Sequence, residues 1–246
     1  MKELFIEFIV QPFYNFLFLL MNYITPDLGL SIIIIIVLFR FIIYPLSKKQ
    51  IQTQIQMKKI QEPLAELKKK FKDTPEELGR AIMKLYKDHN VNPFSGILIL
   101  LIQMPLLFGF YYVFARAGLP EINTDLIYSF VAHPININTN FLGIFELTSK
   151  SAVLAAIAAL TQYFQFRLLM SQGKPEKKKE EKKDGVMGDV MKGMQTQMTY
   201  VMPLFIMFIA YTFGAIIALY FIVSNIFSIG QEIYIRKKDI RKGVQS

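Results

Sequence analysis

Apolar runs separated by polar segments predict several membrane-spanning helices. The clearest run, residues 28–47, is twenty residues long, enough for a helix to cross a hydrocarbon core of about 30 Å. Residues 94–115 and 151–170 form two more runs. Residues 193–231 carry no charge over thirty-nine positions. As one helix this stretch would measure about 58 Å, so it is expected to fold back as two spans with a turn near Gly214.

The first run, residues 4–24, allows two interpretations. It is apolar but is interrupted by Glu7, Gln11, Pro12 and Asn15. It can be a transmembrane helix or uncleaved signal anchor, or an amphipathic helix that lies in the membrane interface. A signal peptide needs a basic start and a small-residue cleavage site, and the sequence supplies neither well. The interfacial helix is the favoured interpretation.

Residues 48–92 switch to a basic, amphipathic pattern that predicts a soluble antiparallel helical hairpin. Apolar residues recur at helical spacing on both arms: Ile51, Ile55, Ile60, Leu64, Leu67 and Phe71, then Leu78, Ile82 and Leu85. Between the arms, Thr74 is expected as the N-cap, with Pro75 at the first helical position and Glu77 closing a capping box. Pro63 is expected to bend the first arm.

These patterns predict an all-α polytopic membrane protein with five transmembrane helices. The expected segments are an interfacial helix (1–26), span one (27–47), a cytoplasmic hairpin (48–92), span two (93–116), an extracytoplasmic loop (117–148), span three (149–170), a charged cytoplasmic loop (171–196), span four (197–213), span five (214–235) and a basic tail (236–246).

The positive charges fix the expected orientation. The formal charge is +9, and Lys and Arg number eleven in residues 48–92, seven in 171–195 and five after residue 233. Only three lie in the N-terminus and the 116–150 connection. By the positive-inside rule, the hairpin, the charged loop and the C-terminus are cytoplasmic in a cell membrane. The charged loop has the low-complexity composition of a disordered segment.

Composition and motifs disfavour catalysis. The absence of cysteine excludes disulfides, thiolate metal sites and a cysteine nucleophile, and the two histidines, His89 and His133, lie far apart. No phosphate-binding loop or His-Glu zinc pair occurs, and the in-membrane serines Ser31 and Ser224 have no basic partner at catalytic spacing. We therefore expect no enzymatic activity and no cofactor.

Arg40 is the only ionisable residue of the run 28–47. It lies roughly 12 Å inside the Lys48 end, where a charge costs about 2.5–3.5 kcal/mol or more, so it is a candidate functional residue. The alternative is an arginine that extends to the nearer interface. Gln103, in the second span, can equally serve an interhelical hydrogen bond or a substrate.

Four motifs lie in a fixed order along the chain: the PLSKKQ exit after Arg40, YKDHNVNPFSG leading into LLIQMP, MPLF, and LYFIVSN. In this order the chain resembles the YidC/Oxa/Alb family of membrane protein insertases, from about Val10 to Ile235. The resemblance is to the compact form without the large periplasmic domain. It departs from the family in FGAIIALYF, where Ile216 and Phe221 replace the usual residues. The turn near Gly214 is therefore expected to be built differently, and Phe221 is not expected to carry the role of the family aromatic.

The resemblance implies that Arg40 lies in a polar, water-containing groove in the inner leaflet, open to the cytoplasm and closed to the outside. It implies further groove positions on the second, third and fifth spans: Gln103, Gln162, Gln165, Tyr220, Ser224 and Asn225. It also implies an insertase and chaperone for nascent membrane proteins that hydrolyses no nucleotide. The implied partners are the lipid bilayer, the ribosome and a Sec translocon, with no specific DNA.

Two alternative functions stay open. One is a Sec-associated folding scaffold without autonomous insertion. The other is a transporter in which Arg40 binds a substrate anion, but no inverted repeat or matched pair of interrupted helices supports it. The basic segments have a further alternative role as topology determinants rather than as a ribosome contact.

Overall fold

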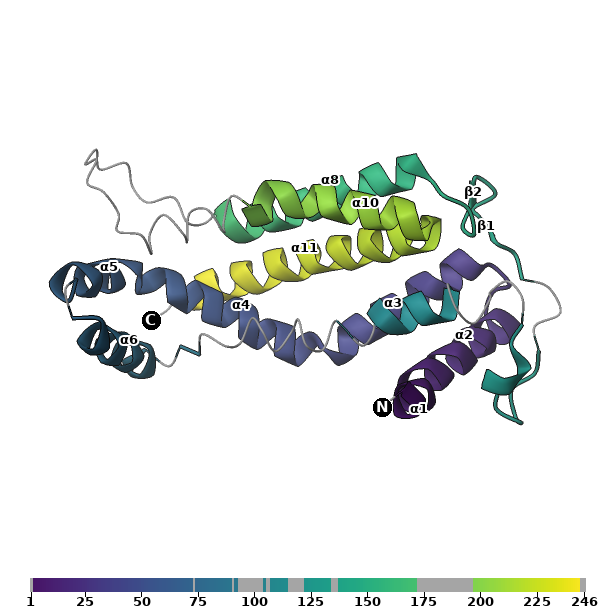
Figure 1. The fold of residues 1–246 in the computed structure, drawn as a ribbon, viewed down its shortest axis with the longest axis horizontal. Helices are drawn as coiled ribbons and strands as arrows, with labels where there is room; N and C mark the ends of the chain where they lie inside the picture. The colour runs from purple at the N-terminus through teal and green to yellow at the C-terminus, as the bar shows by residue number, and fades with distance from the viewer. Residues whose placement is uncertain are drawn as a thin grey trace. The chain divides into compact units, whose positions relative to one another are not determined.

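The structure is a computed structural model that describes residues 2–72, 74–89, 91–92, 104, 107–114, 122–133, 137–171 and 197–243 (Figure 1). The chain forms two compact units, Met1–Phe41 with Pro105–Gly230 and Ile42–Met104 with Gln231–Ser246. The described part is mostly helical, as predicted, but two short antiparallel strands, β1 (Asn140–Phe141) and β2 (Phe145–Glu146), modify the all-α expectation.

The helices of the first unit follow the apolar runs. They are α1 (Lys2–Phe5), the π-helical segment η1 (Ile6–Val10), α2 (Gln11–Tyr23), α3 (Leu28–Ile42), the short 3₁₀ turn η2 (Thr124–Leu126), α8 (Ala152–Ser171), the π-helical η3 (Gln197–Val201), α10 (Met202–Phe213) and the first part of α11 (Ala215–Gly243). The second unit contains α4 (Tyr44–Lys59), α5 (Gln61–Lys70), α6 (Pro75–Asp88) and the end of α11.

Two described helical stretches are long and apolar enough to cross a membrane, Glu3–Tyr23 and Ala215–Lys238. A third is obtained if the bent pair Leu28–Ile42 and Tyr44–Met57 forms one span. The apolar helices Ala152–Leu168 and Thr199–Phe213 are shorter. Glu3–Tyr23 thus has the length of a span as well as the pattern of an interfacial helix. Most of the predicted second span and of the charged loop lies outside the described residues.

Prolines account for the irregularities of these helices. Proline lacks a backbone N–H and its ring collides with the carbonyl four residues earlier, which disturbs the preceding turn. The π-helical segments end two residues before Pro12 and Pro203. The break between α3 and α4 precedes Pro45, and the break between α4 and α5, at Ile60, precedes Pro63. The bend predicted at Pro63 is therefore observed as a helix break at Ile60, three residues earlier.

The core of the first unit joins α2, α3, α8, α10 and α11. Large side chains from α2 and α3 are fully buried, including Tyr14, Phe18, Ile32 and Ile36. Small buried residues on the other helices belong to the same core: Ala155, Ala158, Ala210 and Ala218. Alanines let helix backbones approach closely, which suits the tight pairing of α8 with α10 (Figure 1).

One end of the first unit, which we call the loop end, is held by backbone hydrogen bonds. The first N–H groups of a helix have no partner within the helix. Segment 137–149 supplies such partners: the N–H of Leu28 donates to Asn138 O (2.9 Å), and those of Ala215 and Ile216 donate to Ser149 O (2.9 Å) and Leu147 O (3.3 Å). The starts of α3 and α11 are therefore fixed on the same segment.

Gly214 makes the turn between α10 and α11, as predicted. Its φ of +98° and ψ of 170° fall in a region that only glycine occupies without strain. A Cβ there would also lie 3.5 Å from Ser149 O.

We expect Gly214→Ala to lower the free energy of unfolding by about 1–3 kcal/mol, because alanine is strained at this φ and ψ. Thermal unfolding of the purified protein in detergent measures the change. Gly230→Ala is the matched control: it lies within α11 and its new Cβ would meet no atom within 4 Å. That control should gain up to about 1 kcal/mol of helix propensity. Equal losses in the two variants would refute the assignment of the turn.

Polar residues of α2 bind the segment 122–132. Asn15 is 2% exposed, and its Nδ2 donates to Leu126 O (2.7 Å) while its Oδ1 accepts from the Tyr128 N–H (2.7 Å). The Tyr14 hydroxyl accepts from the Asn123 N–H (2.9 Å), and Asn22 Nδ2 donates to Ala132 O (2.6 Å). The polar interruptions of the first apolar run therefore hold a connecting segment.

Asn15→Leu is expected to destabilise the first unit by about 2–3 kcal/mol, because the Leu126 carbonyl and the Tyr128 N–H would be left buried without partners. The same thermal unfolding assay applies. Asn22→Leu is the control, since its bond to Ala132 is exposed and should cost under about 1 kcal/mol. A loss at Asn22 as large as that at Asn15 would contradict the explanation by burial.

In the second unit, α5 packs against α6. Ile51, Ile60 and Leu64 are buried, whereas α6 has no fully buried residue. Thr74 occupies the N-cap position and Pro75 begins α6, as predicted. The predicted capping box is not formed, because the Thr74 hydroxyl donates to the Glu77 carboxylate (3.4 Å) and caps no backbone N–H.

Candidate functional site

Arg40 lies in the last turn of α3 with its side chain only 9% exposed. Its Nη2 donates a hydrogen bond to the hydroxyl of Ser224 on α11. Within the described residues it makes no ion pair, so its charge is met by a neutral oxygen. An arginine stays protonated in proteins, and a buried charge is expensive unless it is paired. The structure thus brings together two of the predicted site residues, and no described carboxylate neutralises the positive charge between them.

Tyr220 lies one turn before Ser224 on α11 and is buried. Residues four apart share a helix face, so Tyr220 lies on the same side of α11 as Ser224. Its hydroxyl has no hydrogen-bond partner among the residues that the structure describes. The nearby Ser224 side chain is the polar group of this region closest to that hydroxyl along α11.

Asn225 faces a different helix. Its Nδ2 donates to Thr161 Oγ1 on α8 (3.1 Å), and that hydroxyl donates to Ala158 O (2.9 Å). On the same helix, Gln162 is partly buried, and the Oε1 of Gln165 is buried without a partner in the described part of the chain. Asn225 therefore joins α11 to α8, and no hydrogen bond within the described residues links it to Arg40. Gln103 lies outside the described residues.

An apolar layer separates Arg40 from the loop end. Counting from the helix starts at about 1.5 Å per residue, Arg40 lies roughly 18 Å along α3 and Ser224 roughly 14 Å along α11. Between this level and the loop end, Phe110 packs on Tyr220 (5.0 Å between ring centroids) and on Phe13 (4.5 Å). Phe221, at the position where the family aromatic was in doubt, packs edge-on against Tyr220 (5.2 Å).

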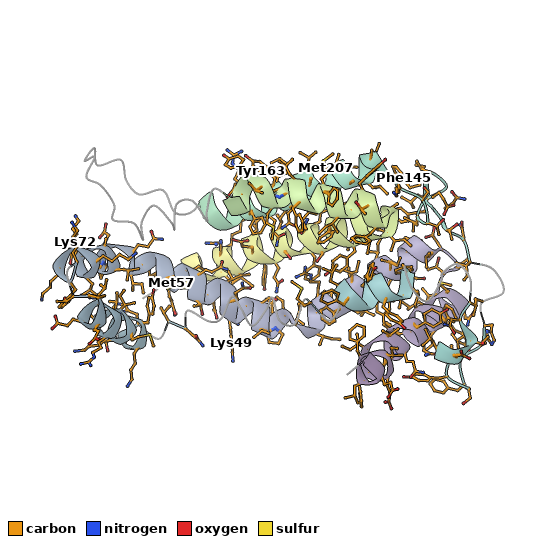
Figure 2. All side chains as sticks on the ribbon, in the orientation of Figure 1. Lys49, Met57, Lys72, Phe145, Tyr163 and Met207 are labelled. Carbon is orange, nitrogen blue, oxygen red and sulfur yellow. The ribbon has the colours of Figure 1, made fainter. Side chains whose placement is uncertain are left out.

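Two further polar residues belong to this region and were not among the predicted site positions. Thr161 bonds Asn225, and the Ser228 hydroxyl donates to Ser224 O (2.8 Å). The spacing of Ser228, four residues after Ser224, is the signal that could have found it, since residues four apart share a helix face. Figure 2 labels Tyr163 on α8 and Met207 on α10, the two helices that pack together.

The side chains brought together here suit the binding of a charged group. No group of His, Cys, Asp or Glu side chains in the described residues could hold a metal ion. What the site offers an anion is a permanent positive charge and a tyrosine hydroxyl that can donate. Such a set fits a carboxylate or another anion, because charge-assisted hydrogen bonds to a guanidinium are strong and can be bidentate.

The chain is similar to known proteins over most of its length. The family model described as "60Kd inner membrane protein" matches residues 19–242. A Clostridium perfringens protein named "Membrane protein insertase YidC" is 34% identical over 208 residues, 84% of this chain and 77% of its own length. Proteins of the same name from Oceanobacillus iheyensis and Clostridium tetani are 33% and 29% identical, over 87% and 85% of this chain and 76% and 81% of theirs.

Proposed function

The chain belongs to the 60Kd inner membrane protein family, and from this membership we propose that it is a membrane protein insertase that receives the tail of a nascent membrane protein at Arg40. The single observation that supports the role of Arg40 is its burial beside Ser224 without an ion pair in the described residues. A protein that kept this arginine only for packing would be expected to neutralise its charge.

The mechanism follows from the cost of moving charge through lipid. A substrate with an acidic external tail must carry carboxylates across a hydrocarbon core in which an unpaired carboxylate is prohibitive. Arg40 offers such a tail a charge-assisted partner part of the way across. The apolar segment of the substrate then partitions into lipid, so the step needs no nucleotide. A membrane potential that is positive outside favours each acidic charge by about 2.3 kcal/mol per 100 mV.

The proposal includes a topology. Five spans place the hairpin 48–92, the charged loop 171–196 and the C-terminus in the cytoplasm, with residues 1–26 as an interfacial helix. Arg40 then lies in a polar groove of the inner leaflet, to which Gln103, Gln162, Gln165, Tyr220, Ser224 and Asn225 contribute. The basic hairpin and tail are the proposed contact with the ribosome, whose RNA attracts Lys and Arg, and a Sec translocon is a proposed partner.

Proteoliposomes that contain only the purified protein test the proposal. A single-span substrate with an acidic tail should insert, as measured by protection of the tail from added protease. Insertion only when a Sec translocon is added would identify the protein as a folding scaffold. Flux of ions or solutes through the same vesicles, without insertion, would instead identify a transporter.

A further inference from the structure

The hairpin of β1 and β2 ends in a turn of unusual composition. Asn140 pairs with Glu146 and Phe141 with Phe145, and the Ile144 N–H donates to Phe141 O (3.1 Å). The two central residues, Leu142 and Gly143, have φ of +52° and +68°. Turns with two positive φ angles favour Asn, Asp or Gly at both positions. Leu142 is the only described residue other than glycine with positive φ.

The turn also presents its apolar side chains outward. Leu142 is 62% exposed and Ile144 is 72% exposed. In water this arrangement has two free-energy costs. The backbone of Leu142 is strained by its positive φ, and two branched apolar side chains are exposed to solvent. Asparagine at position 142 would relieve both. We call residues 142–144 the hairpin tip.

The hairpin lies beside the start of a candidate membrane span, so the apolar surroundings available to its tip are those of the membrane. Its base is bonded to the starts of α3 and α11, and α11 begins the candidate span Ala215–Lys238. Figure 1 shows the strands beside the end of α10 and the start of α11, and Figure 2 labels Phe145 there. The last residue of α2, Tyr23 (78% exposed), and Phe130 in the segment 122–132 (75% exposed) also expose large rings. Aromatic side chains gather where membrane helices meet the interface.

The charged residue of the hairpin is kept at its base. Glu146 accepts hydrogen bonds from the hydroxyls of Thr148 (2.6 Å) and Thr139 (3.0 Å). These bonds, that of Thr148 above all, lower the pKa of Glu146, so the carboxylate stays ionised. Residues 141–145 carry no charge. The hairpin is thus apolar at its tip and charged at its base, as an element that dips into a membrane from the aqueous side would be.

We propose that the hairpin tip inserts into the lipid interface at the loop end and anchors this end of the protein in the leaflet. The occupant of the exposed surface of Leu142 and Ile144 is the acyl region of phospholipid. This anchor is separate from the site at Arg40, and it does not depend on the substrate or on the direction of insertion.

A single tryptophan tests the proposal directly, because the chain has none of its own. Ile144→Trp is purified as the full chain and reconstituted in vesicles of phospholipid brominated on the acyl chains. Its emission should be shifted to the blue and quenched by bromine. Asn140→Trp, on the exposed side of the hairpin base, is the matched control and should be quenched several-fold less.

Leu142→Asn in the Ile144→Trp background separates insertion from folding. Asparagine suits the positive φ at position 142, so the turn should keep its stability while the quenching falls several-fold. If the Ile144→Trp variant emits at the wavelength of tryptophan in water, without quenching, the proposal is overturned. Equal quenching at positions 140 and 144 would also overturn it, since the tip would then not be the inserted element.

Discussion

Replacement of Arg40 by alanine should reduce the insertion of substrates with acidic external tails by about tenfold or more. A charge-assisted hydrogen bond contributes about 1.5–3 kcal/mol, and each 1.4 kcal/mol corresponds to about a factor of ten. Arg40→Lys should retain part of the activity, because a wet polar site rewards the charge more than the fork geometry of the guanidinium. The rate of tail protection in proteoliposomes measures both variants.

The substrate provides the control for this prediction. When the acidic residues of the tail are replaced by their amides, insertion should depend much less on Arg40, because the charge it receives has been removed. A normal rate for Arg40→Ala with the acidic tail would show that the charge of Arg40 has no part in insertion here.

Ser224→Asp should reduce insertion by supplying Arg40 with an intramolecular counter-ion. Ser224 accepts a hydrogen bond from Arg40 in the structure, so an aspartate there would place a permanent counter-ion on the guanidinium. Insertion of acidic-tailed substrates should fall by about tenfold, as for Arg40→Ala, while neutral-tailed substrates insert at close to the normal rate. Ser224→Ala should keep most of the activity, since it leaves the positive charge in place.

Ser228→Asp is the matched control, because Ser228 lies one turn further along α11 and bonds the backbone of Ser224 rather than Arg40. It adds the same charge to the same helix without a direct counter-ion for the arginine. If the two aspartates inhibit equally and with every substrate, the effect is a general one of charge in the span, and Arg40 and Ser224 do not act as a pair.

The sequence predicted those features that depend on local chemistry. The turn at Gly214 and the start of α6 at Pro75 follow from residues that permit few alternatives, and both are found. Arg40 was identified because a charge in an apolar run has a high free-energy cost, whether the run lies in lipid or in a protein core. The capping box at Thr74 failed because a threonine hydroxyl can bond either a backbone N–H or the Glu77 carboxylate, and only the coordinates distinguish the two.

What the sequence alone could not provide were the pairings between distant segments. The polar residues Gln11 and Asn15 read as interruptions of an apolar helix, and nothing local indicates that Asn15 binds the backbone at Leu126 and Tyr128. The family resemblance predicts Asn225 as a groove residue, and nothing local indicates that it bonds Thr161 on α8. Neighbouring positions on one helix differ by about 100° in direction, so Ser224 and Asn225 meet different helices.

The backbone contacts at the loop end bear on how this protein is made. The first N–H of α3 has no partner until Asn138 is made, and the partner of Arg40 lies 184 residues further along the chain. At a synthesis rate of about 5–20 residues per second, α3 spends on the order of ten seconds or more in the membrane before the contact with Ser224 can form. During that interval the charge of Arg40 has neither Ser224 nor the rest of α11 beside it. A nascent copy of this chain therefore brings an unpaired charge into the membrane. The finished protein is proposed to reduce the cost of such a charge in its substrates.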